Sequence, residues 1–368
     1  MAKKLRVAIL FGGKSAEHEI SLQSARNVFS ALDKSRFDPV LIGIDKQGKW
    51  HLNSADRFLV NENNPKLIAL NKSSIDLSMS LAAVENQIRT TESGDIGGID
   101  VVFPVLHGPF GEDGSIQGLL KLANVPFVGS GVLGSALGMD KVVMKKLFRD
   151  ASIPTAKFVH FSSSQRGKLR FSEIHDYLGV PFFVKPANLG SSVGISKVKS
   201  ESGFSRAIDE AFKYDRKIIV EENVEGREIE CSVLGNEDPI ASVPGEVICT
   251  SIMDDFYSYQ AKYIDEHGAT LQIPAQLDQN VVTAIQNLAI KAFETLCCEG
   301  MALVDFFLKP NGIVYVNELN TIPGFTSISM YPKLWEASGK SYTQLISDLI
   351  DLAIRRFEQE KNLRTSRD

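Results

Sequence analysis

Near the C-terminal end, two apolar stretches carry two acids and an amide at spacings that suit a metal site. Asp305 lies in the first stretch, Glu318 and Asn320 lie in the second, and a turn sequence at 310–312 separates them. A two-residue Asn-Gly loop at 311–312 would place Asp305 directly across a β-hairpin from Glu318. Side chains alternate along a strand, so Glu318 and Asn320 share a face. These hard oxygen ligands suit Mg²⁺ that substrate phosphates also hold, although a surface hairpin with solvated acids has the same pattern.

Two glycine-containing loops could bring backbone N–H groups to an anionic ligand. Residues 107–118 read HGPFGEDGSIQG and connect an apolar strand to a helix, so glycines and acids gather at a strand end. A structural glycine turn with His107 as a cap is the alternative. Residues 185–194 start with Lys185 and continue into an Asn-Leu-Gly-Ser-Ser turn whose amides and hydroxyls suit phosphate oxygens. This loop could cover a nucleotide, or it could be an ordinary hairpin turn.

The N-terminal glycines do not form a phosphate-binding P-loop. Residues 12–15 read GGKS, but the P-loop pattern requires a glycine at position 8, where the chain has Ala8. Glu17 follows at the predicted start of the first helix, and a carboxylate there can simply interact with the helix dipole.

Three lysines and one acidic strand end carry weaker signals. Lys141, Lys145 and Lys146 lie on one predicted helix, and such a cluster usually forms a solvated face. Residues 220–228, which read VEENVEGRE, end a predicted strand; backbone groups there could hold an adenine and a carboxylate could hold a ribose. Neither pattern is specific by itself.

Composition limits the possible class of protein. The 368 residues are 43% apolar, which is enough for two or three hydrophobic cores. A net charge of -5 gives no basic field of the kind that binds nucleic acid or anionic membranes. The four cysteines form no CxxC pair, and no apolar run reaches the length of a secretory or membrane-spanning segment. We therefore expect a cytoplasmic enzyme with no disulfide framework, zinc site, nucleic-acid partner or membrane partner.

The pattern of predicted elements changes twice along the chain. Strands, glycine turns and helices alternate up to about residue 129, which predicts an open parallel sheet; shorter strands and helices from 130 predict an α+β lobe. A third region begins near 222, and its segment 249–274 lacks a sustained apolar period, as functional or disordered loops do. Strands are predicted at 5–11, 39–45, 100–108, 156–161, 181–186, 193–199, 217–222 and 228–234, and helices at 139–148 and 204–214.

Taken together and in this order, these segments resemble the D-alanine:D-alanine ligases of the ATP-grasp superfamily. The resemblance runs from the first strand to about Trp335, and its strongest signatures are 107–118 and VDFFLKPNGIVYVNELNTIPG at 304–324. It implies an N-terminal α/β domain (1–129), a central ATP-grasp lobe (130–221) and a C-terminal lobe with lid and metal site (222–368). It also implies a homodimer that acts on D-alanine and ATP. A D-alanyl phosphate would form and be attacked by a second D-alanine, giving D-alanyl-D-alanine for peptidoglycan.

The resemblance also implies roles for individual residues. Nucleotide contacts would come from Lys141, Lys185, Ser192, Glu221, Val224, Glu228 and Lys262. Two Mg²⁺ ions, with Mn²⁺ as an alternative, would be held by Asp305, Glu318 and Asn320. Substrate binding and catalysis would involve Glu17, His107, Ser191, Tyr263, Gly324, Ser329 and Met330. Glu17 would hold the ammonium of the first D-alanine and connect through Ser191 to Tyr263 on the predicted lid, 249–274. His107 and the Ser191–Tyr263 pair are alternative acceptors for the proton of the attacking amine.

One position departs from the family pattern. The family usually has arginine two residues before the first metal ligand, whereas this chain has Leu303, which the strand period places on the same face as Asp305. The change predicts a missing oxyanion donor, a loss that commonly costs on the order of a hundredfold in rate. A D-serine or D-lactate acceptor therefore stays open, although Tyr263 favours an amine acceptor. A non-catalytic ATP-binding homologue is a further alternative.

Overall fold

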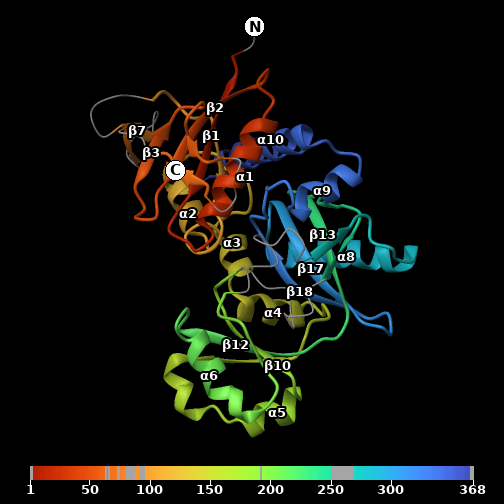
Figure 1. Cartoon of the computed structure of the whole chain (residues 1–368). Coiled ribbons are helices and arrows are strands. Elements are labelled where there is room, and N and C mark those ends of the chain that lie inside the picture. Colours follow the sequence, from red (N-terminus) through yellow and green to blue (C-terminus); the bar gives the residue numbers. More distant parts are fainter. Residues whose placement is uncertain are drawn as a thin grey trace.

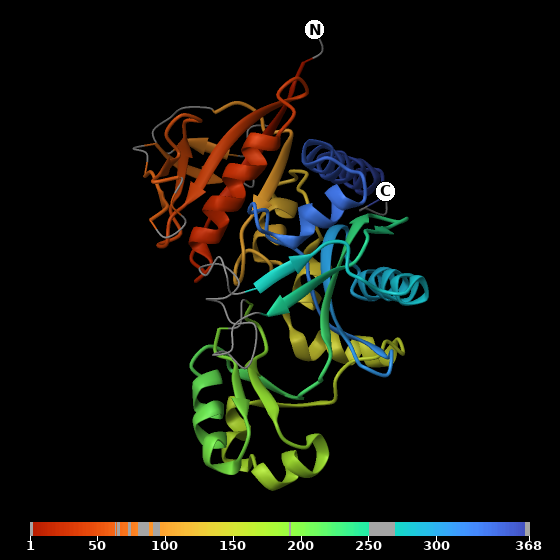
Figure 2. The ribbon, with the colours of Figure 1, turned by 45° about the vertical axis from the view of Figure 1, so that its right-hand side comes forward.

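The computed structural model describes residues 3–62, 64, 67–72, 75–79, 88–90, 96–190, 193–249 and 269–364. Three main sheets follow one another along the chain, and the lobe built on the second sheet projects away from the other two (Figures 1 and 2). The predicted lid lies largely outside the described residues, since 250–268 is not among them.

The first sheet is mixed, with the strand order β7-β6-β3-β2-β1-β8. β1 pairs in parallel with β2 and β8, and its apolar run is buried on both faces, as a central parallel strand requires. The predicted parallel sheet is therefore correct for β2, β1 and β8, while β3, β6 and β7 pair antiparallel. The elements are β1 Leu5–Gly12, α1 His18–Ala31, β2 Phe37–Ile44, β3 Trp50–Asn53, β4 Leu59–Val60, β5 Ala69–Leu70, β6 Asp76–Met79, β7 Ile88–Thr90, β8 Val101–Val105, α2 Ser115–Leu122 and α3 Val132–Met139.

The second sheet is antiparallel, with the order β11-β10-β12-β9, and α5 and α6 pack on it around an apolar cluster that includes Phe182 and Phe204. The elements are α4 Lys141–Asp150, β9 Phe158–Ser162, the 3₁₀ helix η1 Ser163–Lys168, α5 Phe171–Leu178, β10 Phe182–Pro186, β11 Ser196–Val198, α6 Glu201–Ala211 and β12 Lys217–Glu222.

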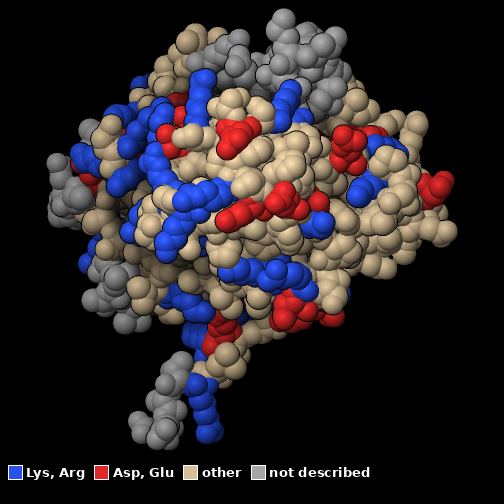
Figure 3. Space-filling model, turned by 90° about the horizontal axis from the view of Figure 1, so that it is seen from below, with Lys and Arg blue, Asp and Glu red and all other residues tan. Residues whose placement is uncertain are grey.

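Basic and acidic side chains are interspersed on the surface seen from below (Figure 3). No single-sign field covers this face.

The third sheet has the order β16-β15-β13-β17-β18, and β14 also pairs with β13. Its strands are antiparallel, and α8 packs against β13, β17 and β18. The elements are β13 Arg227–Gly235, β14 Ile240–Ala241, β15 Gly245–Cys249, β16 Ala269–Gln272, α8 Gln279–Thr295, β17 Gly300–Leu308, β18 Val314–Asn320, α9 Met330–Ala337 and α10 Tyr342–Lys361.

The last two helices return to the N-terminal sheet. Phe325, Tyr331 and Trp335 are buried in the same apolar cluster as Val7 and Phe103, and α10 contacts α1 and β8. The first and third sheets are therefore joined by a shared core, which fixes the segment 321–330 between them. No helix within the described ranges is long and apolar enough to cross a membrane.

The helix predicted at 139–148 is divided at Asp140. The Asp140 carboxylate accepts hydrogen bonds from the N–H groups of Val142 and Val143, both at 3.1 Å, and so caps a new helix, α4. The prediction of one continuous helix was wrong because the apolar period does not show that Asp140 has an extended backbone. The break makes Lys141 the first residue of α4.

Candidate active site

The hairpin of β17 and β18 carries the three predicted metal ligands. Its loop has three residues, 310–312, because the N–H of Lys309 bonds to Ile313 O at 2.9 Å; the predicted two-residue loop was wrong. A bulge at Asn317 then shifts the pairing by one residue, so Asp305 still lies directly across from Glu318. The extra loop residue and the bulge compensate for each other in register, and both carboxylates reach the same pocket.

Two neighbours of Asp305 in the sheet also face this pocket. Leu303 lies two residues before it, as expected from the strand period, and pairs with Asn320. Glu230 on β13 lies directly across from Asp305, and sequence reasoning missed it. Its position two residues after Glu228 on a predicted strand was the available signal.

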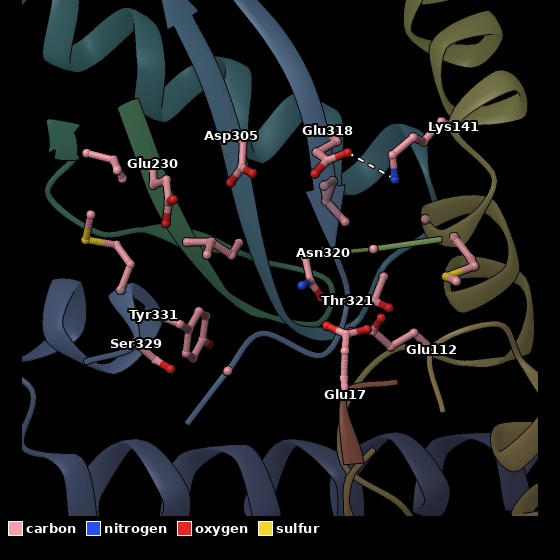
Figure 4. Close-up of a pocket in the computed structure, with 18 of the residues that line it drawn as sticks. Glu17, Glu112, Lys141, Glu230, Asp305, Glu318, Asn320, Thr321, Ser329 and Tyr331 are labelled. Atoms are coloured by element: carbon pink, nitrogen blue, oxygen red, sulfur yellow. Dashed lines mark ion pairs between the residues drawn. The ribbon is translucent and has the colours of Figure 1, made fainter. Parts of the chain in front are cut away.

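The pocket that Asp305 and Glu318 reach is strongly acidic; it is the smaller of two neighbouring pockets and is called the smaller pocket below. Among its described lining residues, five carboxylates accompany Lys141 as the single lysine or arginine, and Figure 4 shows these side chains converging from several elements. The lining consists of Glu17, Glu112, Gly138, Met139, Lys141, Met144, Leu189, Gly190, Glu230, Val247, Leu271, Leu303, Asp305, Glu318, Leu319, Asn320, Thr321, Gly324, Ile328, Ser329, Met330 and Tyr331.

Lys141 connects the acidic sheet face to the loop at 185–194. Its Nζ lies 3.1 Å from Glu318 Oε2 and donates to Leu189 O at 2.9 Å, and its side chain is only 10% exposed. The alternative of a solvated lysine face is therefore wrong for Lys141 and for Lys145, which is 1% exposed; only Lys146 of the three is exposed.

Glu17 lies at the cap position of α1 but makes no side-chain cap hydrogen bond there. Its carboxylate instead lies against Gly108 and Gly190, the two loops singled out by their glycines. A Cβ at Gly108 would lie 2.7 Å from Glu17 Oε2, and the φ of +73° there is also one that side chains rarely adopt. Both loops therefore close around Glu17, which is 8% exposed.

His107 lies behind the pocket and connects the first sheet to the third. Its Nδ1 is 3.1 Å from Ile322 O, and its Nε2 is 3.2 Å from Ser24 Oγ, which accepts a bond from the N–H of Phe325. Because a carbonyl oxygen only accepts, Nδ1 carries a proton. Burial lowers the pKa of His107, but Glu112 and Glu17 outweigh it and raise that pKa overall. These hydrogen bonds connect His107 to both Ile322 and, through Ser24, Phe325.

Glu112 completes this buried cluster. It accepts a hydrogen bond from the N–H of Gly108 at 2.9 Å, and its Oε1 is 3.9 Å from His107 Nδ1. Burial raises the pKa of Glu112, and Glu17 adds to the effect while His107 opposes it. Glu112 was not singled out from the sequence, although it belongs to the 107–118 signature.

The segment 321–330 supplies three of the predicted substrate residues, Gly324, Ser329 and Met330. Ser329 Oγ lies 2.8 Å from Thr326 Oγ1 and accepts a bond from the N–H of Thr326 at 3.0 Å. A Cβ at Gly324 would lie 2.6 Å from Ser329 Oγ, so only glycine allows this approach. Gly324, Ser329 and Met330 all line the smaller pocket.

A larger pocket lies between the second and third sheets, and its lining includes five of the predicted nucleotide residues: Lys141, Lys185, Glu221, Val224 and Glu228. Glu221 is buried between Lys185, at 2.6 Å, and Lys145, at 2.9 Å. Burial alone would raise the pKa of Glu221, but the two lysines lower it to about 2. Glu221 is therefore ionised throughout the neutral range. Ser191, Ser192, Lys262 and Tyr263 lie outside the described residues.

Sequence comparison gives the family. The family model "D-ala D-ala ligase N-terminus" matches residues 6–130, and the model "D-ala D-ala ligase C-terminus" matches residues 147–351. This chain belongs to the D-alanine–D-alanine ligase family. It is 54% identical to a D-alanine–D-alanine ligase of Oceanobacillus iheyensis over 99% of each chain. It is 52% identical to D-alanine–D-alanine ligase A of Escherichia coli K12, over 99% of this chain and all of the relative.

Solved structures of the D-alanine–D-alanine ligase family have the same fold. The D-alanine–D-alanine ligase of Coxiella burnetii superposes with a TM-score of 0.84 at 39% identity, covering 98% of this chain and 97% of the other. The VanG D-Ala:D-Ser ligase of Enterococcus faecalis superposes with a TM-score of 0.83 at 35% identity, covering 95% of this chain and all of the other. The predicted fold, an α/β domain followed by a two-lobed ATP-grasp region, is confirmed. The exact domain boundaries stay a prediction.

The donor set on β17 and β18 fits Mg²⁺ better than a metal that requires a complete protein cage. Within the described ranges, no group of three His, Cys, Asp or Glu side chains could hold a metal by itself. Two carboxylates and Asn320 would leave positions for water and phosphate oxygens, as Mg²⁺ prefers. Asn320 Oδ1 already accepts a bond from the N–H of Ile322 at 3.0 Å, which orients it and leaves its second lone pair available.

Proposed function

We propose that this chain uses ATP to join two D-alanines, giving D-alanyl-D-alanine, ADP and phosphate for peptidoglycan precursors. The observation that carries this proposal is the junction of the two pockets. Six residues line both: Lys141, Leu189, Gly190, Glu230, Asp305 and Glu318. A phosphoryl donor in the larger pocket would therefore meet a carboxylate held in the smaller pocket, and D-alanyl phosphate would form there.

ATP would occupy the larger pocket. Lys141 and Lys185 would contact its phosphates, and Glu221, Val224 and Glu228 would contact adenine and ribose. Glu221 would also hold Lys185 in place. Asp305, Glu318 and Asn320 would hold two Mg²⁺ ions. Bound Mg²⁺ would neutralise charge that develops on the phosphoryl group during transfer. Each of these assignments combines family resemblance with the side chain's position in the pocket lining.

The amino acids would occupy the smaller pocket. Glu17 would hold the ammonium group of the first D-alanine, and Gly324, Ser329 and Met330 would contact the second. His107 would position this segment through Ile322 and Ser24. The roles of Ser191, Ser192, Lys262 and Tyr263, and the homodimer, stay predictions from family resemblance.

A D-serine or D-lactate acceptor is the second candidate. Leu303 lines the smaller pocket and packs with Val247, Met330 and Leu271, so this wall is apolar. The similarity to a D-Ala:D-Ser ligase also favours testing it. A non-catalytic ATP-binding homologue is the remaining alternative.

Phosphate release from ATP and Mg²⁺ tests the proposal directly. The reactions contain D-alanine, L-alanine, or D-alanine with D-serine or D-lactate, and mass spectrometry identifies each product. D-Alanyl-D-alanine from D-alanine alone supports the proposed activity. A mixed product formed in preference to the dipeptide would support the second candidate. ATP binding without phosphate release under all of these conditions would contradict both ligase activities.

A further inference from the structure

Lys145 is a buried lysine that the proposed reaction leaves without a role. It lies one helical turn after Lys141 on α4, but its side chain is 1% exposed and is absent from the described lining of both pockets. Its Nζ lies 2.9 Å from Glu221 Oε1 and donates to Thr155 Oγ1 at 3.1 Å. Burying an ammonium group costs free energy unless an opposite charge and hydrogen bonds compensate it. The contacts with Glu221 and Thr155 supply this compensation.

Toward the larger pocket, Lys145 shares one carboxylate with Lys185. Glu221 Oε2 lies 2.6 Å from Lys185 Nζ, while Oε1 faces Lys145. Lys185 and Glu221 line the pocket, whereas Lys145 contacts Glu221 from the protein interior. Two ammonium groups against one carboxylate leave a net positive charge on this group of three side chains, and Lys185 is its member that faces the pocket with Glu221.

Away from the pocket, Lys145 connects through Thr155 to β18, which carries the candidate metal ligands Glu318 and Asn320. Thr155, which accepts from Lys145, donates its own hydroxyl proton to Val316 O at 2.9 Å. Val316 lies on β18, two residues before Glu318. The N–H of Val316 bonds in turn to Pro154 O at 2.8 Å. Lys145 therefore joins α4, the second sheet and the third sheet at one buried point.

The charges explain what loss of Lys145 would do. Burial lowers the pKa of Lys145 and Lys185 acts in the same direction, whereas Glu221 and, more weakly, Glu318 oppose them. Without Lys145, Glu221 would be compensated by Lys185 alone, and that pair would be neutral overall. The attraction of the Glu221–Lys185 pair for phosphate would then fall, because a neutral ion pair attracts an anion less strongly than a group with a net positive charge does.

We propose that Lys145 is a positioning residue of the nucleotide site, which partly neutralises Glu221 so that Lys185 keeps positive charge for the phosphates of ATP. The inference rests on the proposed function, since it assumes that the larger pocket takes ATP. Lys145 should therefore affect the affinity for the phosphates of ATP, whereas a residue needed only for folding would affect every ligand equally.

The test compares ATP with adenosine, which lacks phosphates. Lys145→Met removes the ammonium group, and Lys146→Met on the exposed neighbour of the same helix is the matched control. By calorimetry, Lys145→Met should weaken ATP binding roughly tenfold or more while adenosine binding changes less than about twofold. The KM for ATP should rise correspondingly more than the KM for D-alanine. Lys146→Met should leave both ligands unchanged.

Lys145→Gln provides a second variant that can keep a hydrogen bond to Thr155 or Glu221 without the charge. The same selective loss of ATP affinity is expected. Equal losses for ATP and adenosine would assign Lys145 a structural role and overturn the inference, as would unchanged ATP binding in either variant. A wild-type protein that binds no ATP would overturn the proposed function and the inference together, so the two failures are distinguishable.

Discussion

Glu221, at the wall of the larger pocket, has Lys145 and Lys185 within 2.9 Å, whereas five carboxylates in the smaller pocket share a described lining with Lys141 alone among lysines and arginines. The first arrangement contains its own cations. The second favours cations that ligands supply, such as a divalent metal ion or the ammonium group of an amino acid. The difference separates a carboxylate that pairs with protein side chains from carboxylates that we propose to bind ligands.

Glu221 and Glu318 also differ in exposure, although Glu17 and Glu112 in the smaller pocket are buried. Glu221 is 2% exposed and interacts with lysines from α4 and β10, while Glu318 is 28% exposed and faces the junction of both pockets. A buried carboxylate without cations would be protonated or would destabilise the fold. A partly exposed carboxylate such as Glu318 is accessible to a ligand. Substitutions in the two regions should therefore affect different measurements.

The largest effect is expected at the carboxylates that we propose to hold Mg²⁺. Asp305→Asn and Glu318→Gln should each lower kcat by on the order of a hundredfold to a thousandfold, because a charge that stabilises phosphoryl transfer is lost. The Mg²⁺ concentration for half-maximal phosphate release should also rise. Glu294→Gln, an exposed acid on α8 outside the lining of both pockets, is the control. An unchanged Mg²⁺ dependence in both variants would contradict the metal assignment.

Leu303→Arg should have the next largest effect, and it probes the apolar wall of the acidic pocket. A guanidinium there would supply the missing donor and raise turnover with D-alanine, by about tenfold to a hundredfold. Leu303→Met keeps the volume without the charge and should change little. Steady-state kinetics of both variants with D-alanine and D-serine measure turnover and acceptor affinity. If Leu303→Arg leaves turnover and acceptor affinity unchanged, the missing-donor hypothesis is wrong.

Much of the site could be predicted because its signals are local. Alternation along β17 and β18 placed Asp305, Glu318 and Leu303 on one face, and the prediction survived even though the loop length was wrong. The bulge at Asn317 restored the register, and no sequence rule identifies such a bulge in advance. The pairing was therefore predicted correctly for an incomplete reason.

The residues that were missed depend on contacts between distant segments. Lys145 resembles its exposed neighbour Lys146 in sequence, and only the approach of β12 makes it a buried ion-pair partner. Ser24 is likewise an ordinary helical serine until Phe325, from the far end of the chain, donates its N–H to it. Helical period can indicate a face, but it cannot state which element covers that face.

Glu221→Gln should lower the free energy of unfolding in a pH-dependent way, because it removes the carboxylate that pairs with Lys145 and Lys185. The two lysines lower the pKa of Glu221 to about 2 from its ordinary value of 4.5, so its stabilisation is present above pH 4.5 and is lost as pH falls toward 2. At neutral pH the variant should lose about 3 kcal/mol, less an offset from Lys145, whose pKa is lowered by burial. Urea unfolding at about pH 7 and about pH 3.5 measures the difference, which should shrink at the lower value. Glu294→Gln should show no such trend; an equal loss at both pH values would argue against the ion-pair explanation.

The smallest effect is expected at Ser24, which belongs to neither charge pattern but connects the acidic pocket to the N-terminal sheet. Ser24→Ala leaves the N–H of Phe325 and His107 Nε2 without this partner, and should cost about 1 kcal/mol of stability. Because the segment 321–330 would loosen, KM for D-alanine should rise a few-fold while kcat changes less. Ser30→Ala, on the exposed side of the same helix, is the control. A large fall in kcat with a shifted pH profile in Ser24→Ala would instead indicate that the Ser24–His107 pair takes part in proton transfer, and the positioning role assigned to His107 would be wrong.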